Sequence, residues 1–193
     1  GNGDSLEELE GARTNAAKIS KWAGGIGMCI SSIRSEGAHI NSTGGKACGI
    51  VSVARGMQET MLMYNQGGRR PGSAKLYIHA CHPDLLKFIE LKRISLDPAD
   101  RNRARELFYA IWVPDLFMER VKNNGKWSLF DPSEVGDLSD YWGEEFEKRY
   151  INLEEKNVYK TQHNARDIWN LIYEVNQETG GPDLLSADNA NRA

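Results

Sequence analysis

The sequence predicts an α/β protein with largely parallel strand pairing, and three observations lead to this class. Strand-like runs alternate with helix-like stretches along the chain. The continuous apolar run at 107–113 is typical of a strand covered on both faces. Gly-rich segments separate the elements. Because 193 residues suffice for one domain with a hydrophobic core, we treat residues 1–193 as a single domain.

The first helix is marked by a capping box at its start. Ser5 is followed three residues later by Glu8, so the Ser5 side chain can accept from a free helical N–H while Glu8 reaches back. Helical spacing of apolar residues extends the helix to about Lys21, on a face formed by Leu6, Leu9, Ala16 and Ile19. The glycines at 24 and 25 then end it.

Two Gly-rich loops follow, each attached to a regular element. Alternating apolar residues predict a strand over 26–33. The loop at 34–49 is longer than most connections, and such loops are usually functional or disordered. An apolar stripe predicts a helix over 50–64. The second loop occupies 65–72.

The remaining elements follow from the same signals. Pattern and length predict strands at 75–80, 107–113, 127–130 and 183–186. Proline at a first helical position and apolar periodicity predict helices at 83–92, from Pro114 to 123–125, at 139–154 and at 161–177.

Composition limits the classes of partner. A net charge of −3 gives no bulk attraction toward nucleic acid or an anionic membrane. No apolar run approaches the roughly 20 residues that cross a bilayer. The first residues lack the basic and apolar regions of a signal peptide. We therefore predict a cytoplasmic protein that binds neither nucleic acid nor a membrane.

The cysteines and histidines do not indicate a metal centre. Cys29, Cys48 and Cys81 form no Cys-x-x-Cys pair, and we interpret them as small buried thiols. His79 and His82 are the one close histidine pair, and a metal site needs further ligands. We therefore predict no metal site in this chain.

The Gly-rich loops are the segments with functional potential. Neither carries the complete phosphate-binding or dinucleotide-binding fingerprint. In the loop at 66–72, adjacent glycines allow the backbone to approach a ligand, and Arg69 and Arg70 favour an anion. Two interpretations stay open on this pattern: a loop that reads nucleotides, and a solvated surface turn.

Six segments carry a recognisable pattern, at 19–27, 31–37, 65–72, 103–121, 142–150 and 178–182. Residues 19–27, for example, read Ile-Ser-Lys-Trp-Ala-Gly-Gly-Ile-Gly. These segments resemble the large (alpha, catalytic) subunit of ribonucleotide reductases, of the class I type that depends on a small subunit, and they follow the family order over nearly the whole chain.

The resemblance implies an α/β fold: part, roughly the first half, of a ten-stranded α/β barrel. It also implies an oxidoreductase that converts ribonucleoside diphosphates to deoxyribonucleotides through a cysteine radical. The Asn-Leu-Cys-x-Glu motif of that radical is expected beyond residue 193, and one redox cysteine just before Gly1. The resemblance therefore places no catalytic residue in this chain, which we expect to be inactive alone.

The resemblance assigns regulation and part of substrate binding to this chain. The implied effector-binding residues are Asp4, Ser5, Leu6, Lys21, Arg34, Ile40, Asn41 and Ser42. The implied specificity loop contains Gln66, Gly67, Gly68, Arg69 and Arg70. The implied substrate-binding turn contains Ala23, Gly24 and Gly25. We expect Arg34 and residues 66–72 to share a cavity beside the start of the first helix.

The resemblance also implies cofactors and partners. No cofactor is expected to bind this chain directly, because the radical comes from a partner small subunit. The second loop is one residue shorter than in eukaryote-like members, which leaves adenosylcobalamin as the alternative radical source. The implied partners are the remainder of the large subunit, a second large subunit, the small subunit, ribonucleoside diphosphates, and dNTP or ATP effectors. A second hypothesis is a non-catalytic nucleotide-binding or interaction module derived from such a subunit.

Overall fold

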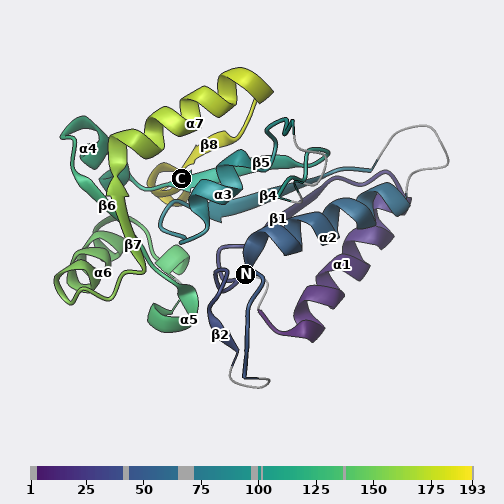
Figure 1. Cartoon of the computed structure of the whole chain (residues 1–193), viewed down its shortest axis with the longest axis horizontal. Helices are drawn as coiled ribbons and strands as arrows, with labels where there is room; N and C mark the ends of the chain where they lie inside the picture. Colours follow the sequence, from purple (N-terminus) through teal and green to yellow (C-terminus); the bar gives the residue numbers. More distant parts are fainter. Residues whose placement is uncertain are drawn as a thin grey trace.

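A four-stranded parallel sheet forms the centre of the protein in the computed structural model (Figure 1). The structure describes residues 4–40, 44–64, 72–96, 100, 102–136 and 138–192. The order of the strands in the sheet follows their order in the chain: β1 (Ile26–Cys29), β4 (Ala74–His79), β5 (Phe108–Val113) and β8 (Asp183–Ser186). The predicted α/β class with parallel pairing is therefore confirmed.

The helices next to this sheet form one row. Parallel neighbours that follow chain order need crossovers of one hand, and right-handed crossovers place the connecting helices on one face. The helices in contact along the row are α1 (Leu6–Lys21), α2 (Gly49–Met63), α3 (Leu85–Glu90) and α7 (Ala165–Thr179). Figure 1 shows α3 in front of β4 and β5, and α1 and α2 side by side.

The two faces of the sheet differ in burial. One face contributes the buried core side chains Met28, Leu76, Ile78, Ile111 and Val113. On the other face, Tyr77 stacks on Trp112 with ring centroids 6.1 Å apart, and Phe108 is 55% exposed. The prediction that residues 107–113 are covered on both faces is therefore wrong for the described chain, because the helix row covers only one face.

A second structural unit packs against the carboxyl ends of the sheet strands. Its strands β6 (Lys126–Leu129) and β7 (Thr161–Asn164) pair antiparallel, and we call residues 126–164 the β6–β7 unit. The accompanying helices are α4 (Asp115–Lys122), α5 (Pro132–Val135), the 3-10 helix η1 (Leu138–Asp140) and α6 (Gly143–Glu155). The Trp127 Nε1 donates to the Ala80 carbonyl at 2.8 Å, which docks the unit on the sheet.

Two predicted helices begin later in the structure than the sequence indicated. The helix predicted at 161–177 divides into β7 and α7, because residues 161–164 pair with β6 and the Asn164 side chain caps α7 by accepting from the Arg166 N–H at 2.9 Å. The helix predicted from Pro83 begins at Leu85, and the Asp84 N–H, which has no partner within the helix, donates to the His82 ring.

Other boundaries change by smaller amounts. The strand predicted at 26–33 ends at Cys29, although the Ile30 N–H still donates to the Tyr77 carbonyl. The loop at 34–49 contains a short antiparallel hairpin of β2 (His39–Ile40) and β3 (Gly45–Lys46). The helix predicted at 139–154 begins at Gly143, and the polar end of the chain forms α8 (Ala187–Arg192).

The turn after α1 holds an alanine in the left-handed region. Ala23 has φ 63°, and the preceding Trp22 N–H donates to the Ile19 carbonyl, which ends the helix. This conformation costs a non-glycine residue about 1–2 kcal/mol, whereas glycine adopts it freely.

We therefore expect Ala23→Gly to raise the free energy of unfolding by about 1 kcal/mol, measured by urea denaturation of the intact protein. Ala17→Gly, inside α1, is the matched control and should lower it by about 1 kcal/mol. Equal destabilisation by both changes would contradict a strained Ala23.

Candidate functional site

A cavity of about 950 Å³ lies between the start of α1, the end of β1, the β2–β3 hairpin and the start of α2. Its volume is in the range of small-molecule sites. Five of the predicted effector-binding residues line it: Asp4, Ser5, Leu6, Arg34 and Ile40. The structure thus brings together residues from both ends of the segment 4–40.

Arg34 supplies an oriented positive charge to the wall of this cavity. Its Nε donates to the Asp4 carboxylate in an ion pair, and its Nη1 donates to the His39 carbonyl at 3.1 Å. The Arg34 and Asp4 side chains are both largely buried. Because the guanidinium fork suits phosphate or carboxylate oxygens, this position can exchange Asp4 for another anion.

The start of α1 adds a second feature that favours anions. The predicted capping box is present: the Ser5 Oγ accepts from the Glu8 N–H at 3.2 Å, and the Glu8 carboxylate accepts from the Ser5 N–H at 3.3 Å. The hydrogen bond from the Ser5 side chain lowers the pKa of Glu8. Free N–H groups and the positive end of the helix dipole therefore lie at the cavity.

Gly49 lets the base of the hairpin pack closely on the start of α2. It has φ 69°, and a Cβ there would lie 2.6 Å from the Asp84 Oδ2 and 2.7 Å from the Glu36 nitrogen. The same Asp84 oxygen accepts from the Glu36 N–H at 3.0 Å and from the Ile50 N–H at 3.3 Å. This close approach brings the start of α2 to the cavity.

Five polar side chains that sequence reasoning missed also line the cavity: Glu7, Glu10, Arg13, Cys48 and Ser52. Arg13 stands on the same face of α1 as Leu6 and Leu9, so helical spacing from the predicted Leu6 could have found it. Its Nη1 pairs with Glu10 at 2.8 Å, and its Nε donates to the Thr60 Oγ1 at 3.1 Å. Cys48 and Ser52 carried no comparable signal.

Lys21 stands apart from the other predicted effector residues. α1 has 16 residues and is therefore about 24 Å long, with Ser5 at one end and Lys21 at the other. Lys21 lines a separate hollow of about 350 Å³ between α1 and the end of α2, beside Thr60 and Tyr64. A single small anion cannot contact both Lys21 and Arg34 in this arrangement.

The predicted substrate-binding turn follows Lys21. A Cβ on Gly24 would lie 2.5 Å from the Ile19 Cγ2, so packing against the end of α1 already requires glycine there. A Cβ on Gly25 would meet no atom within 4 Å. Approach of a substrate to Gly25 therefore stays a prediction.

The second loop and part of the first fall outside the residues that the structure describes. Asn41, Ser42 and residues 66–70 lie outside the described residues. Gly72, the first described residue after that loop, packs against the Ser20 hydroxyl and the Met61 carbonyl and does not line the cavity. The expectation that Arg34 and residues 66–72 share a cavity stays a prediction.

The cysteines and histidines occupy separate environments. Cys81 is buried, with its sulfur 2.9 Å from the His79 Nδ1, whereas Cys29 is half-buried and Cys48 is exposed. The interpretation of all three cysteines as buried thiols is thus wrong for Cys48. Within the ranges that the structure describes, no group of three or more His, Cys, Asp or Glu side chains is placed to hold a metal ion. No helix there combines the length and apolarity needed to cross a membrane.

Comparisons with known proteins cover nearly all of the chain. A family model described as "Ribonucleotide reductase, barrel domain" matches residues 2–193. The ribonucleoside-diphosphate reductase large subunits of monkeypox virus and Danio rerio are each 42% identical over 190 residues, which are 98% of this chain and 24% of the relative. The large subunit of Arabidopsis thaliana is 42% identical over 98% of this chain and 23% of the relative. The chain therefore spans about a quarter of the length of the curated relatives it matches.

Proposed function

This chain belongs to the ribonucleotide reductase barrel-domain family, and from that premise we propose that it is the part of a ribonucleoside-diphosphate reductase large subunit that binds a deoxynucleotide effector. The observation that supports this most is the cavity that joins Asp4, Ser5, Leu6 and Arg34. The four parallel strands and their single row of helices are the part of the barrel that carries this cavity.

The cavity offers a complementary group for each part of a nucleotide. The Arg34 guanidinium suits the phosphates. Asp4 and Ser5 suit a sugar hydroxyl, because both side chains can accept a hydrogen bond. The apolar wall suits the flat base, and its side chains are Leu6, Leu9, Ile33, Ile40 and Val53. Binding then exchanges the Asp4–Arg34 ion pair for a phosphate–Arg34 pair, which releases Asp4 toward the sugar.

The wider activity follows from the family and is part of the same proposal. The complete subunit reduces ribonucleoside diphosphates in the cytoplasm, with the turn at 23–25 near the substrate and the loop at 66–70 between effector and substrate. The radical comes from a small subunit, or from adenosylcobalamin in the alternative, and a second large subunit completes the effector site. A non-catalytic module is the less favoured reading, because the similarity to large subunits covers 98% of the chain.

Cys48 provides a direct probe of the proposed nucleotide cavity. It is exposed and lines the cavity, so a bound nucleotide should shield its thiol. We expect saturating dTTP, dGTP or dATP to slow alkylation of Cys48 by about tenfold in the complete large subunit assembled as a dimer, as quantified by peptide mass spectrometry. Cys29 is the internal control, because it does not line the cavity. An unchanged Cys48 rate with all three nucleotides would overturn the proposed function.

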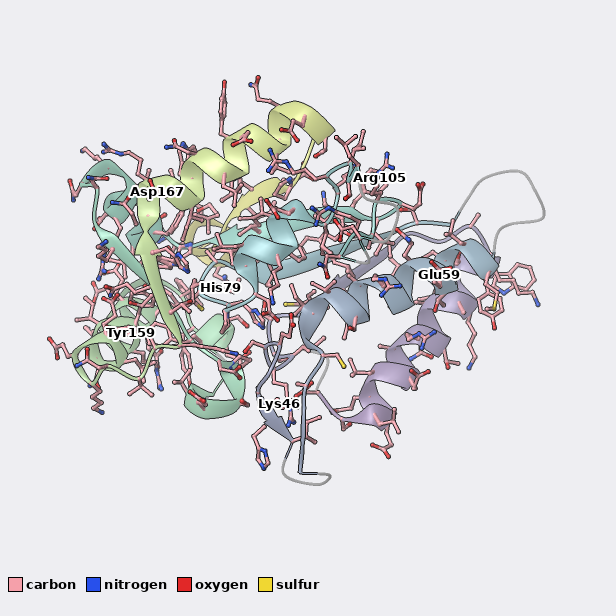
Figure 2. All side chains as sticks on the ribbon, viewed as in Figure 1. Lys46, Glu59, His79, Arg105, Tyr159 and Asp167 are labelled. Atoms are coloured by element: carbon pink, nitrogen blue, oxygen red, sulfur yellow. The ribbon has the colours of Figure 1, made fainter. Side chains whose placement is uncertain are left out.

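Arg34→Ala should weaken this protection. Loss of a charged hydrogen bond to phosphate corresponds to about 10-fold to 100-fold in nucleotide affinity, which a titration of Cys48 protection measures. Arg105→Ala is the matched control, because Figure 2 shows Arg105 far from Lys46, which marks the β2–β3 hairpin. An equal effect of both changes would argue against a phosphate at Arg34.

A further inference from the structure

The loop that carries Arg34 is held by two side chains from the β6–β7 unit. The Ser35 N–H and the Ser35 hydroxyl both donate to the Asp131 Oδ2, the first at 3.1 Å. The Lys160 Nζ donates to the Ser35 Oγ at 2.6 Å and to the Glu36 carbonyl at 2.8 Å. Asp131 follows Ser35 by 96 residues and Lys160 follows it by 125. The loop is therefore fixed by residues from a distant part of the chain.

These contacts leave the Ser35 hydroxyl a single orientation. Its one proton goes to the Asp131 carboxylate, and its oxygen accepts from the Lys160 ammonium. Ser35 and Asp131 are almost completely buried, so charged hydrogen bonds between them are strong. The second Asp131 oxygen accepts from the Ser133 N–H at 2.9 Å and from the Ser133 hydroxyl at 2.6 Å.

The backbone around these tethers is fixed as well. Asp131 caps the start of α5, and the Lys160 N–H donates to the Leu129 carbonyl at 2.8 Å, which prolongs the β6–β7 ladder. Burial raises the pKa of Asp131, and the hydrogen bonds from Ser133 and Ser35 outweigh it, so the net pKa is lowered and Asp131 is an anion near neutral pH. The Asp131 side chain and the backbone of Lys160 are thus fixed before a ligand enters the cavity.

Arg34 is the residue most directly affected by these tethers. It lies between Ile33 and Ser35, which are both buried, while its own side chain lines the cavity. Neighbouring Cα atoms are only about 3.8 Å apart, so a shift of Ser35 moves the Arg34 backbone by a similar amount. Neither Asp131 nor Lys160 lines the cavity. Neither residue therefore contacts a ligand in the cavity, and the loop is the structural link between them and Arg34.

We propose that Asp131 and Lys160 are positioning residues for the nucleotide-binding loop, which hold Ser35 and Glu36 and thereby place the Arg34 guanidinium. This inference rests on the proposed function, because it assigns both residues a role in nucleotide affinity. The proposal couples the β6–β7 unit to effector binding. By thermodynamic linkage, a nucleotide that orders Arg34 also stabilises the β6–β7 unit, and stabilising that unit raises nucleotide affinity by the same factor.

Titrations of Cys48 protection in the intact protein test the role of the two tethers. Asp131→Asn and Lys160→Met should each lower nucleotide affinity by about tenfold, in the range found for coupled contacting residues. Lys160→Arg should restore most of the affinity, because arginine keeps the charge and the donors. In an Arg34→Ala background, Asp131→Asn should change affinity by less than about twofold, since the residue through which it acts is gone.

A control variant in the same unit separates positioning from general stability. Glu154 accepts from the Arg120 Nη2 at 2.6 Å and from the Ser128 hydroxyl at 2.7 Å and does not touch Ser35, so Glu154→Gln should lower Tm without changing affinity. Equal losses of affinity in Glu154→Gln and Asp131→Asn would overturn the positioning role. Losses of affinity that simply add when Asp131→Asn is combined with Arg34→Ala would overturn it as well. Protection in the wild type with unchanged affinity in both tether variants would overturn this proposal alone. No protection in the wild type would overturn the proposed function and this inference together.

Discussion

Replacement of Trp127 by alanine is expected to lower the free energy of unfolding by about 4 kcal/mol, because it removes the anchor between the β6–β7 unit and the sheet. The Trp127 side chain is fully buried. Its ring stacks on Tyr150 with centroids 4.4 Å apart and meets Phe117 edge-on at 5.0 Å. The change leaves a large cavity and also deprives the Ala80 carbonyl of its donor.

Urea denaturation of the intact protein, together with hydrogen exchange over residues 126–164, measures this loss. Trp127→Phe keeps an aromatic ring but lacks the N–H, and should cost about 1–2 kcal/mol. Trp22→Ala is the matched control, because Trp22 is 81% exposed, and should stay within about 0.5 kcal/mol of the wild type. If Trp127→Ala behaves like Trp22→Ala, the β6–β7 unit does not depend on this anchor. Because that unit carries Asp131 and Lys160, Trp127→Ala should also weaken nucleotide protection of Cys48.

The second large effect is expected at Asp188. This buried carboxylate accepts from the Asp115 N–H with one oxygen and from the Gly143 N–H with the other. Asp115 and Gly143 are the first residues of α4 and α6, so one anion occupies the positive ends of two helices. Asp188→Ala should lower the free energy of unfolding by about 2–3 kcal/mol, because it leaves two part-buried donors without their acceptor.

Hydrogen exchange at the Asp115 and Gly143 amides is the sharpest measurement, and both should exchange faster in Asp188→Ala. Asp188→Asn keeps one acceptor oxygen, so it should protect one of the two amides and lose less stability. Asp183→Ala is the matched control from β8, because Asp183 is half-exposed and pairs with Lys75 at the surface, and should cost at most about 1 kcal/mol. Unchanged exchange at both amides would show that the helix ends do not rely on Asp188.

Several elements of the fold were determined by the sequence because their signals are local. The capping box at Ser5 and Glu8 needs partners only three residues apart, and it is present as predicted. The strand predicted at 183–186 and the helix predicted at 50–64 agree with β8 and α2 to within a residue. The alternation of these elements sufficed for the α/β class with parallel pairing.

Other elements depended on partners that the sequence does not reveal. Residues 161–164 have helical neighbours, but they form β7 because β6, some 35 residues earlier, offers free backbone groups for pairing. The apolar run at 107–113 was predicted to be covered on both faces, yet the row of α1, α2, α3 and α7 covers one face, and Phe108 on the other face is 55% exposed. The local sequence of a strand does not indicate which of its two faces the helices of the fold will cover.

The candidate site shows the same division. The family resemblance of the sequence predicted an effector site that includes Asp4, Ser5, Leu6, Arg34 and Ile40. These five residues line one cavity in the structure. Only the tertiary structure separated Lys21 from them, because a 16-residue helix holds its two ends about 24 Å apart. Only the tertiary structure brought Asp131 and Lys160 to the buried hydroxyl of Ser35, because a hydrogen bond between residues about a hundred positions apart forms only once the chain between them has folded.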